Sequence, residues 1–246
     1  MTDLQKGETL DDLQNGLFII QSETGFRFGM DAVLLADYAD VQPEEKILDL
    51  GCGNGIIPLL LAARNGEVRI TGLEIRKESA GLARRSTAYN HLEDRITIEE
   101  GDIREAVSRF GAASFDVVIS NPPYMIVSHG KISPNEGIAT AKHEVCCTFE
   151  DLARAAAGLL RDHGRLYLVH RPFRLAEILD TLREYRLEPK HIRLVHPFAD
   201  REANLVLIEA VRGGNARVTV APPLIVYREP GVYTEEVRRI YRMKDV

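Results

Sequence analysis

From residue 46 onward, short apolar runs alternate with longer amphipathic segments, separated by glycine-rich or polar turns. The runs predict strands, and the segments between them predict helices. Strands that alternate with helices form a parallel sheet with right-handed crossovers. The expected strands are residues 46–50, 68–75, 95–100, 115–120, 164–169, 191–196 and 203–211, and the expected helices are 56–64, 77–90, 103–109, 149–160 and 173–185.

The last two expected strands have no helix between them, which predicts an antiparallel pair at one edge. We therefore expect an α/β, Rossmann-like fold with a seven-stranded, mostly parallel sheet and an antiparallel edge strand. A chain of 246 residues is long enough for one such domain with small additions. The expected parts are a cap at 1–40, a core domain at 41–212 and a C-terminal extension at 213–246. Residues 125–148, an insertion containing Gly, Ser and Pro, are expected to form a lid over the substrate.

The first 40 residues predict a hairpin and a short helix. Apolar residues 17–22 and 26–28 flank Glu23-Thr24-Gly25, which reads as a hairpin turn. The helix is expected at 32–38, with Asp31 as its N-cap. The tail from Arg212 is less regular: residues 217–227 contain Pro222-Pro223, residues 233–242 are expected to form a terminal helix, and the tail is left without a predicted place in the fold.

Composition limits the class of protein. The chain is 45% hydrophobic and 28% charged, as in ordinary globular proteins. Its apolar runs fall short of the roughly 20 residues that cross a bilayer, and its acidic start does not resemble a secretory leader, so we expect a cytoplasmic protein without membrane contact. Cys52, Cys146 and Cys147 show no disulfide or zinc spacing, and we expect no metal.

The first strand runs directly into Asp49-Leu50-Gly51-Cys52-Gly53-Asn54-Gly55. Glycines at this point permit positive φ and a close approach of the backbone to a ligand. The N–H groups at the start of the following helix also favour a polar ligand. We therefore expect the ligand to contact Gly51, Cys52, Gly53 and Gly55.

Three acids end three neighbouring strands of the predicted sheet: Asp49, Glu74 and Asp102. Such sheets bind ligands at the carboxyl ends of their strands. The negative charge would repel the pyrophosphate of a dinucleotide, but it suits S-adenosylmethionine, which carries a sulfonium, an ammonium, a ribose and an adenine. A simpler interpretation, that the acids only cap the following helices, stays open, above all for Asp102.

The fourth expected strand ends in Ser120-Asn121-Pro122-Pro123-Tyr124. Two prolines stop strand pairing and leave carbonyl oxygens exposed. The Asn121 amide oxygen and the Pro122 carbonyl can accept the two protons of a planar amino group that stacks on Tyr124. These acceptors would turn the nitrogen lone pair toward a methyl donor, and positioning would drive the displacement. The alternative is a proline-stiffened turn with a packed tyrosine.

These two motifs together resemble the class I S-adenosylmethionine-dependent methyltransferases. The resemblance implies that 49–55 binds the methionine part of the donor, Glu74 the ribose and Asp102 the adenine. The neighbouring Ile75 and Ile103, and Asn121 at the reacting end, are then also expected in the cofactor site. The Asn-Pro-Pro-Tyr motif further implies methylation of a nitrogen in a planar group.

Residues 18–211 resemble the bacterial tRNA(Val) adenine-37 N6-methyltransferase family. Three features carry this resemblance: the segment Phe26–Leu35, the segment Arg201–Leu207, and a core that starts without a long helical domain before it. The resemblance implies methyl transfer to N6 of an adenine in tRNA, with Asp31 over the cofactor, a role compatible with its N-cap role. Guanine N2 of rRNA and a protein glutamine are alternatives, because the same motif marks enzymes acting on them. A third alternative is a non-catalytic S-adenosylmethionine-binding module for RNA or assembly.

An RNA substrate requires a basic surface. The net charge is −6 and the pI about 5.7, so any such surface must be local. Clusters with this potential are Arg161, Arg165, Arg171 and Arg174; Arg238, Arg239, Arg242 and Lys244; and His129, Lys131, Lys142 and His143.

Overall fold

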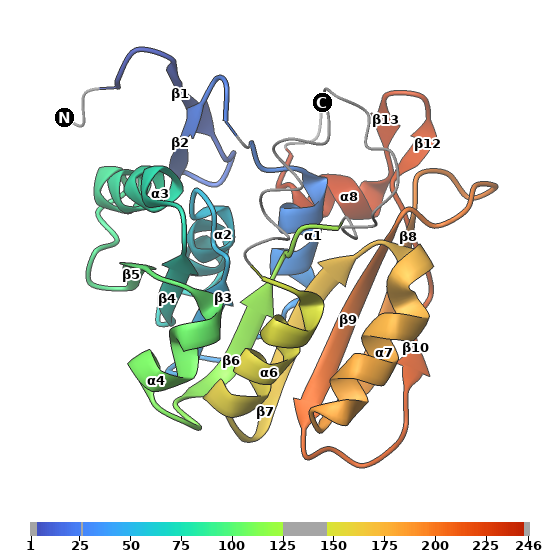
Figure 1. Cartoon of the computed structure of the whole chain (residues 1–246). Helices are drawn as coiled ribbons and strands as arrows, with labels where there is room; N and C mark the ends of the chain where they lie inside the picture. Colours follow the sequence, from blue (N-terminus) through green and yellow to red (C-terminus); the bar gives the residue numbers. More distant parts are fainter. Residues whose placement is uncertain (1–3, 26, 125–146, 244–246) are drawn as a thin grey trace, which may run out of the picture.

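One central sheet organises the computed structural model, which describes residues 4–25, 27–124 and 147–243 (Figure 1). Its strands lie in the order β10-β8-β9-β7-β6-β3-β4-β5, and β11 also pairs with β8. The bounds are β3 Lys46–Leu50, β4 Arg69–Glu74, β5 Ile96–Glu100, β6 Phe115–Ser120, β7 Leu160–His170, β8 Leu187–His196, β9 Leu205–Arg212, β10 Thr219–Val220 and β11 Leu224–Ile225.

The expected α/β sheet is confirmed, but in the described residues two short strands of the tail, β10 and β11, extend it from the seven expected strands to nine. Strands β5, β4, β3, β6 and β7 are mutually parallel, whereas β9 runs antiparallel to both β7 and β8. After β3 the chain adds strands on one side, through β4 and β5, and then returns to add β6 on the other side. The carboxyl ends of β3 and β6 therefore flank a topological switch point, where sheets of this kind bind ligands.

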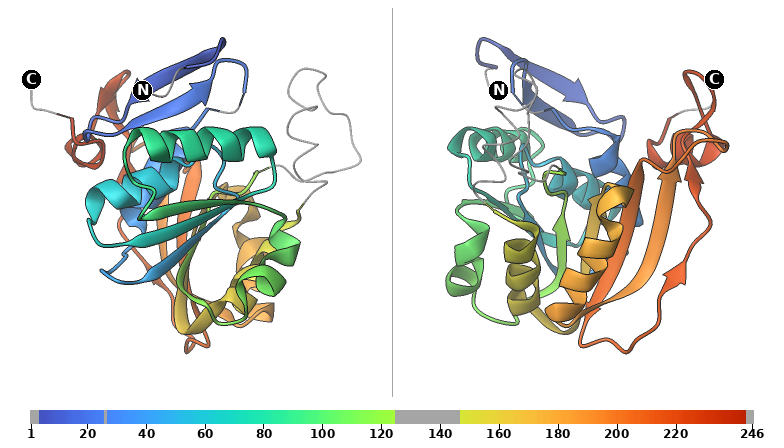
Figure 2. Two further views of the ribbon diagram at one scale, coloured as in Figure 1. Left: turned by 90° about the vertical axis from the view of Figure 1, so that its left-hand side faces the viewer. Right: turned by 45° about the vertical axis from the view of Figure 1, so that its right-hand side comes forward.

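Helices cover both faces of the sheet (Figure 2). Successive strand residues point to opposite faces, so Ile47 packs with one hydrophobic cluster and Leu48 with the other. The first face carries α1 (Met30–Tyr38), α2 (Ile56–Arg64) and α3 (Lys77–Tyr89); the second carries η1 (Ile103–Glu105), α4 (Ala106–Phe110), α6 (Phe149–Leu159), η2 (Pro172–Arg174) and α7 (Leu175–Glu184).

The N-terminal hairpin differs from the prediction. Strand β2 (Phe18–Ser22) pairs backward with β1 (Glu8–Asp12), so the predicted turn at 23–25 is wrong. The turn lies between these strands, where Gln14 and Gly16 have φ of 58° and 85°. Asn15-Gly16 is a strong hairpin signal, but the polar, acidic β1 lacks the apolar alternation that would have marked it as a strand.

Helix α1 begins at Met30 with Gly29 as its N-cap, so the prediction that Asp31 is the N-cap is wrong. Asp31 instead lies in the first turn, and its Oδ1 accepts the N–H of Ala32 at 2.9 Å. The helix begins earlier than expected because Met30 contributes to the apolar cluster beneath it. The other Asp31 oxygen contacts the Tyr124 hydroxyl, in the loop after β6.

Polar side chains of α3 fasten the hairpin to the core. Asn90 accepts the N–H of Phe18 at 2.8 Å and donates to its carbonyl at 2.6 Å. Ser86 Oγ accepts the N–H of Ile20 at 2.9 Å. Strand β2 therefore satisfies part of its backbone on side chains rather than on a further strand.

The C-terminal tail joins the sheet and then crosses its upper end (Figure 1). Strands β10 and β11 pair parallel with β8, and β12 (Tyr227–Glu229) and β13 (Val232–Tyr233) form a small hairpin. Helix α8 (Glu235–Ile240) packs near α1, and Arg64 of α2 donates to the Ile240 carbonyl at 3.3 Å. Within the described residues, no helix combines the length and apolar character that crossing a membrane requires.

Candidate active site

The loop after β3 needs its glycines. Gly51, Gly53 and Gly55 all have positive φ, at 78°, 56° and 85°. A Cβ on Gly55 would also lie 3.0 Å from the Cβ of Ala83, so α3 approaches the loop closely. Both Gly51 and Cys52 donate their N–H groups to the Leu73 carbonyl of β4, at 2.8 and 3.1 Å. The loop is thereby held between two strands and a helix.

Cys52 is a packing residue in this loop. Its side chain is buried, and its Sγ lies 2.7 Å from where a Cβ on Gly72 would be. Burial, and then the nearby Asp49, raise the pKa of the thiol well above its ordinary value. A neutral, buried thiol contributes contacts rather than reactivity.

Asp49 is fully buried at the end of β3, and neither carboxylate oxygen has a hydrogen-bond partner among the described residues. Burial, and then the charge of Glu74, raise the pKa of Asp49 well above its ordinary value. A buried carboxylate without a partner is costly. Its two oxygens are therefore acceptors that a cationic ligand could use.

Asn54 adds a second acceptor that the sequence analysis did not single out. Its side chain is buried, and its Nδ2 donates to Gln21 Oε1 at 3.2 Å. Within the described residues, its Oδ1 has no partner. Gln21 is itself buried and accepts the N–H of Phe28 at 3.1 Å, so β2 fixes the orientation of Asn54. The spacing between Gln21 and Asn54 gives no local signal of this contact.

Glu74 ends β4 beneath the loop. Its Oε2 accepts the N–H of Gly53 at 2.9 Å, and its Oε1 accepts the N–H of Arg76, also at 2.9 Å. The carboxylate therefore braces the glycine loop and retains lone pairs for further donors. The adjoining Ile75 is 42% exposed, an unusual fraction for an apolar residue at a strand end. It offers an open apolar surface beside the acid.

Asp102 caps η1, as the simpler interpretation expected. Its Oδ1 accepts the N–H of Arg104 at 2.9 Å, and the Arg104 guanidinium pairs with the same carboxylate at 2.5 Å. The bond from Arg104 is the main cause that lowers the pKa of Asp102. Ile103 lies across from Gly51, within 4.0 Å of where a Cβ on that glycine would be. The cap does not test the expected role of Asp102 in reading adenine, which stays a prediction.

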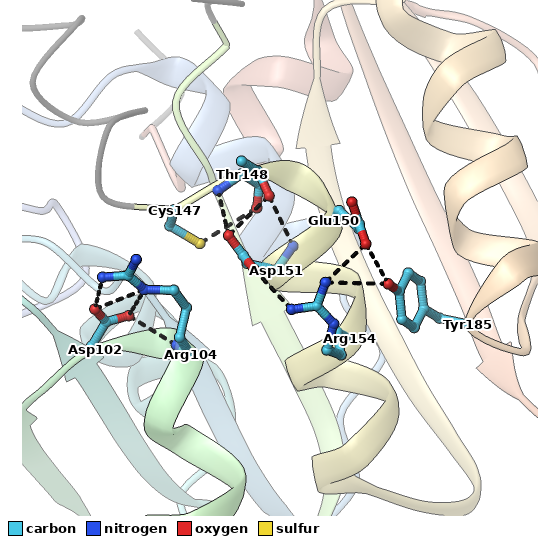
Figure 3. Close-up of polar contacts among 8 residues, drawn as sticks. All are labelled: Asp102, Arg104, Cys147, Thr148, Glu150, Asp151, Arg154 and Tyr185. Carbon is cyan, nitrogen blue, oxygen red and sulfur yellow. Dashed lines mark hydrogen bonds and ion pairs between the residues drawn. The ribbon is translucent and has the colours of Figure 1, made fainter.

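The start of α6 lies beside this pair (Figure 3). Thr148 and Asp151 form a reciprocal capping box, in which each side chain accepts the other residue's N–H at 3.1 Å. Of the lid expected at 125–148, only Cys147 and Thr148 are among the described residues. Cys146 and the four basic residues of that insertion, His129, Lys131, Lys142 and His143, lie outside them. The box fixes the start of α6 next to Asp102.

The loop after β6 brings together Asp31, Asn121 and Tyr124. The Tyr124 hydroxyl lies 2.8 Å from Asn121 Oδ1 and also contacts Asp31 Oδ2. Burial, and then the Asp31 carboxylate, raise the pKa of Tyr124, so its hydroxyl stays protonated. Ser120 Oγ donates to the Leu50 carbonyl at 2.7 Å, which joins the ends of β6 and β3. The half-buried Pro122 follows at this junction.

The Tyr124 ring already has partners. The Arg171 guanidinium lies over it at 5.0 Å, and the His170 ring meets it edge-on at 5.2 Å. His170 is buried, and its Nδ1 accepts the N–H of Arg171 at 2.7 Å. Burial is the first cause that lowers the pKa of His170 to about 4, so the imidazole is neutral near pH 7. The sequence analysis missed His170, although a histidine ending a buried strand was a signal.

The predicted basic cluster of β7 is not one surface. Arg161 and Arg165 lie near the amino end of the strand, whereas Arg171 and Arg174 follow its carboxyl end. Because residues 160–165 advance only two register positions, these two pairs lie on the order of 20 Å apart at about 3.3 Å per position. Arg161 and Arg165 also pair with Asp116 and Glu45, both at 2.5 Å. In the described part of the chain, no three His, Cys, Asp or Glu side chains gather as a metal site requires.

Comparison with known proteins now decides the family. Residues 27–186 match the methyltransferase small domain family. The chain is 33% identical, over 90% of its length and 89% of the relative, to a tRNA1(Val) (adenine(37)-N6)-methyltransferase of Porphyromonas gingivalis. A relative with the same name from Aeromonas hydrophila is 30% identical, over 85% of this chain and 86% of that one. The chain belongs to this methyltransferase family.

Solved structures agree with the fold of the methyltransferase. A predicted O-methyltransferase from Agrobacterium tumefaciens superposes with a TM-score of 0.72 and 29% identity, over 87% of this chain and 96% of that one. A geranyl diphosphate C-methyltransferase from Streptomyces coelicolor, crystallised with S-adenosyl-L-homocysteine, gives a TM-score of 0.56 at 16% identity, over 74% and 78% of the two chains. The second likeness concerns the fold alone.

Proposed function

We propose that this methyltransferase transfers the methyl group of S-adenosylmethionine to the exocyclic N6 of an adenine in tRNA. The observation that carries the proposal is that the acidic site at the end of β3 lies next to the Asn-Pro-Pro-Tyr loop after β6. Asp49 pairs in register with Ile119 of the adjacent strand β6, and Asn121 follows two residues later, directly after that strand ends. An unpaired carboxylate and an oriented amide therefore stand side by side at the switch point. A tRNA substrate would place the reaction in the cytoplasm.

The residues of the cofactor side fit the donor. S-Adenosylmethionine supplies a methyl group on a positively charged sulfur. The two unpaired oxygens of Asp49 and the unpaired Asn54 Oδ1 suit its positive charges and ammonium protons. Glu74, with lone pairs still available, suits ribose hydroxyls, and the exposed Ile75 suits the face of a base. Asp102 and Ile103 would lie at the adenine, opposite Gly51.

The residues of the catalytic loop fit an amino group better than a hydroxyl. A planar amino group has two protons, and the loop offers two acceptors, the Asn121 amide oxygen and the Pro122 carbonyl. The single hydrogen of the Tyr124 hydroxyl goes to Asp31, the stronger acceptor. A half-turn of the Asn121 amide then donates an N–H to Tyr124 and directs its oxygen to the substrate.

This arrangement needs no strong base before methyl transfer. The acceptors would hold the two amino protons and direct the nitrogen lone pair at the methyl carbon, so that an N–C bond would form as the C–S bond of the sulfonium breaks. The sulfur would leave as the neutral thioether, and the surplus proton on nitrogen would pass to water. The gain comes from positioning and from fixed dipoles. The relatives named above act, by their names, on adenine N6 in a tRNA, which supports adenine over guanine N2 and over a protein glutamine.

The test is nucleoside mass spectrometry of tRNA from a strain that lacks this chain. We expect loss of N6-methyladenosine, its return with the wild-type gene, and no return with Asn121→Ala. Loss of N2-methylguanosine or of a ribose methyl group instead, or an unchanged RNA with an unmethylated protein glutamine, would contradict the proposal.

A further inference from the structure

A cavity of about 310 Å³ opens beside Tyr124. It lies toward the β8 edge of the sheet, away from Asp49, Glu74 and Asp102 at the ends of β3, β4 and β5. It lies over the carboxyl ends of β7 and β8 and the start of β9, and the tail closes its outer side. Of the residues predicted to contact the methyl donor, Asp31 lines this cavity, whereas Asn121 and the others do not. The side chains that the argument uses are Asp31, Tyr124, Arg171, Asn204 and Tyr227.

Tyr227 lies within a row of aromatic rings, and the Phe198 ring meets it at 5.6 Å with planes 35° apart. The Tyr227 ring stacks on Tyr233 with centroids 5.1 Å apart and planes 17° apart, and Tyr233 stacks on Tyr241 at 5.8 Å and 11°. The backbone holds the row in place, because Tyr227 donates its N–H to the Pro197 carbonyl at 2.9 Å. A ring fixed in this way can bind a flat ligand with little loss of conformational entropy.

A cation lies at the opposite wall. The Arg171 guanidinium covers the Tyr124 ring at 5.0 Å and donates to the Asn204 carbonyl at 2.9 Å. The walls therefore combine aromatic rings, a guanidinium and hydrogen-bonding groups, which is the combination that binds bases of single-stranded nucleic acid. The volume is at the lower end of small-molecule sites, which begin at about 300 Å³. It suits one planar base rather than a longer ligand.

We propose that this cavity holds the nucleobase adjacent to the target adenine in the RNA strand. The inference rests on the proposed function, since it takes the target amino group to lie at Asn121. Tyr124 connects the two places: its hydroxyl meets Asn121, and its ring lines the cavity. A strand that places one base at Asn121 thus has its neighbour beside Tyr124. The tail is then part of the substrate site.

The test uses an RNA hairpin that the enzyme methylates and two versions with an abasic nucleotide on the 5′ or the 3′ side of the target. For the wild-type enzyme, we expect one abasic version to raise KM about 5- to 100-fold, as loss of base stacking does. Tyr227→Leu removes the planar ring but keeps apolar volume. It should raise KM for the intact hairpin and make the enzyme insensitive to that abasic nucleotide.

Tyr227→Phe is the matched control, because it keeps the ring, and it should behave as wild type toward all three hairpins. The Kd for S-adenosylmethionine should be the same in all variants, a readout that a general loss of folding would change. The inference is overturned if the abasic versions bind as well as the intact hairpin, or if Tyr227→Leu remains as sensitive to them as wild type. If the enzyme binds the donor but methylates no adenine in RNA, the proposed function itself fails.

Discussion

The two sides of the switch point are built in different ways. On the donor side, Asp49, Glu74 and Asp102 lie at or just after the carboxyl ends of β3, β4 and β5, and each acid lies beside its own glycine or helix start. On the acceptor side, the cavity draws on five segments far apart in the sequence: Asp31, Tyr124, Arg171, Asn204 and Tyr227. The donor side is acidic and depends on local motifs, whereas the acceptor side is aromatic and depends on tertiary packing.

The two sides also differ in how their polar groups are hydrogen-bonded. Among the residues that the structure describes, the donor side leaves buried oxygens of Asp49 and Asn54 unpaired, as a site for a cationic ligand requires. The acceptor side pairs its polar groups with one another, as Tyr124 does with Asp31 and Arg171 with Asn204. A substrate base must therefore displace or join existing contacts. Substitutions on the two sides should affect different constants.

The largest effect is expected at Asn121, where the two sides meet. Asn121→Ala removes an acceptor of the target amino group and should lower kcat about 100- to 1000-fold, the usual loss for one preorganised polar group in an active site. The Kd for S-adenosylmethionine should be unchanged. Single-turnover methylation and calorimetric titration give the two values. Normal turnover by this variant would remove Asn121 from the mechanism.

Asp49→Asn tests the donor side. Loss of a charge-assisted bond should weaken S-adenosylmethionine about 10- to 100-fold. The donor-free variant should fold at least as well as wild type, because a buried carboxylate without a described partner is replaced by a neutral amide. Calorimetry and thermal unfolding measure both. An unchanged donor affinity would mean that Asp49 does not face the cation.

The pH dependence of the donor-free enzyme sharpens this test. The pKa of Asp49 is raised above its ordinary value of 3.8, so the folded chain holds this proton more tightly than the unfolded chain. The Asp49 contribution to the free energy of unfolding therefore falls as pH rises above that ordinary value. Donor affinity should rise with pH, since the ionised carboxylate binds the cation. In Asp49→Asn both of these dependences should disappear.

Tyr124→Phe separates orientation of the amide from contact with the cavity. It deletes the hydroxyl that lies between Asp31 and Asn121 but keeps the ring under Arg171. Loss of one hydrogen-bonding group should lower kcat about tenfold and leave KM for RNA near its wild-type value. A change confined to KM would show that the hydroxyl binds substrate rather than orienting Asn121.

Gln21→Ala tests the coupling of the N-terminal hairpin to the glycine loop. It leaves the N–H of Phe28 and the Nδ2 of Asn54 without their acceptor and should lower the free energy of unfolding by about 1–3 kcal/mol. Donor affinity should fall slightly, and KM for RNA should not change. Gln21 Nε2 also donates to Asp11, so Asp11→Ala, which removes this contact and leaves the acceptor of Phe28 and Asn54 in place, serves as the control. A higher KM for RNA with normal affinity for S-adenosylmethionine would mean that the hairpin acts on the acceptor side.

The smallest effect is expected from titration of His170. Its pKa of about 4 keeps the ring neutral at higher pH, so kcat should show no inflection from this group between about pH 5.5 and 8. Histidine NMR resonances, assigned with His170→Phe, should show the low midpoint. A midpoint near the ordinary 6.5 would mean that the ring is charged in part of this range.

The sequence predicted the donor side well because its signals are local. β3, α2 and β6 fall on the predicted residues, and the glycine loop has the positive φ that its composition required. The acceptor side offered only the Asn-Pro-Pro-Tyr motif. Its other members, such as Arg171 and Tyr227, meet through the reversal of β9 and the return of the tail along β8, which no local pattern encodes.

The N-terminal errors have the same origin. The hairpin turn was placed after β2 because apolar residues lie on both sides of 23–25, whereas its true partner β1 is acidic. Gln21 and Asn54 are 33 residues apart and contact each other only because α3 holds the hairpin against the loop. Local sequence thus predicts the ends of strands but not what packs over them.

The central claim is that a sulfonium donor and a flat amino group meet where β3 and β6 leave the sheet. A crystal structure of the enzyme with S-adenosyl-L-homocysteine and a short RNA containing the target adenine tests it most directly. The account predicts the amino group of homocysteine at Asp49 and Asn54, and the adenine N6 within hydrogen-bonding distance of the Asn121 and Pro122 oxygens. Homocysteine bound elsewhere, or an adenine that contacts neither oxygen, would contradict it.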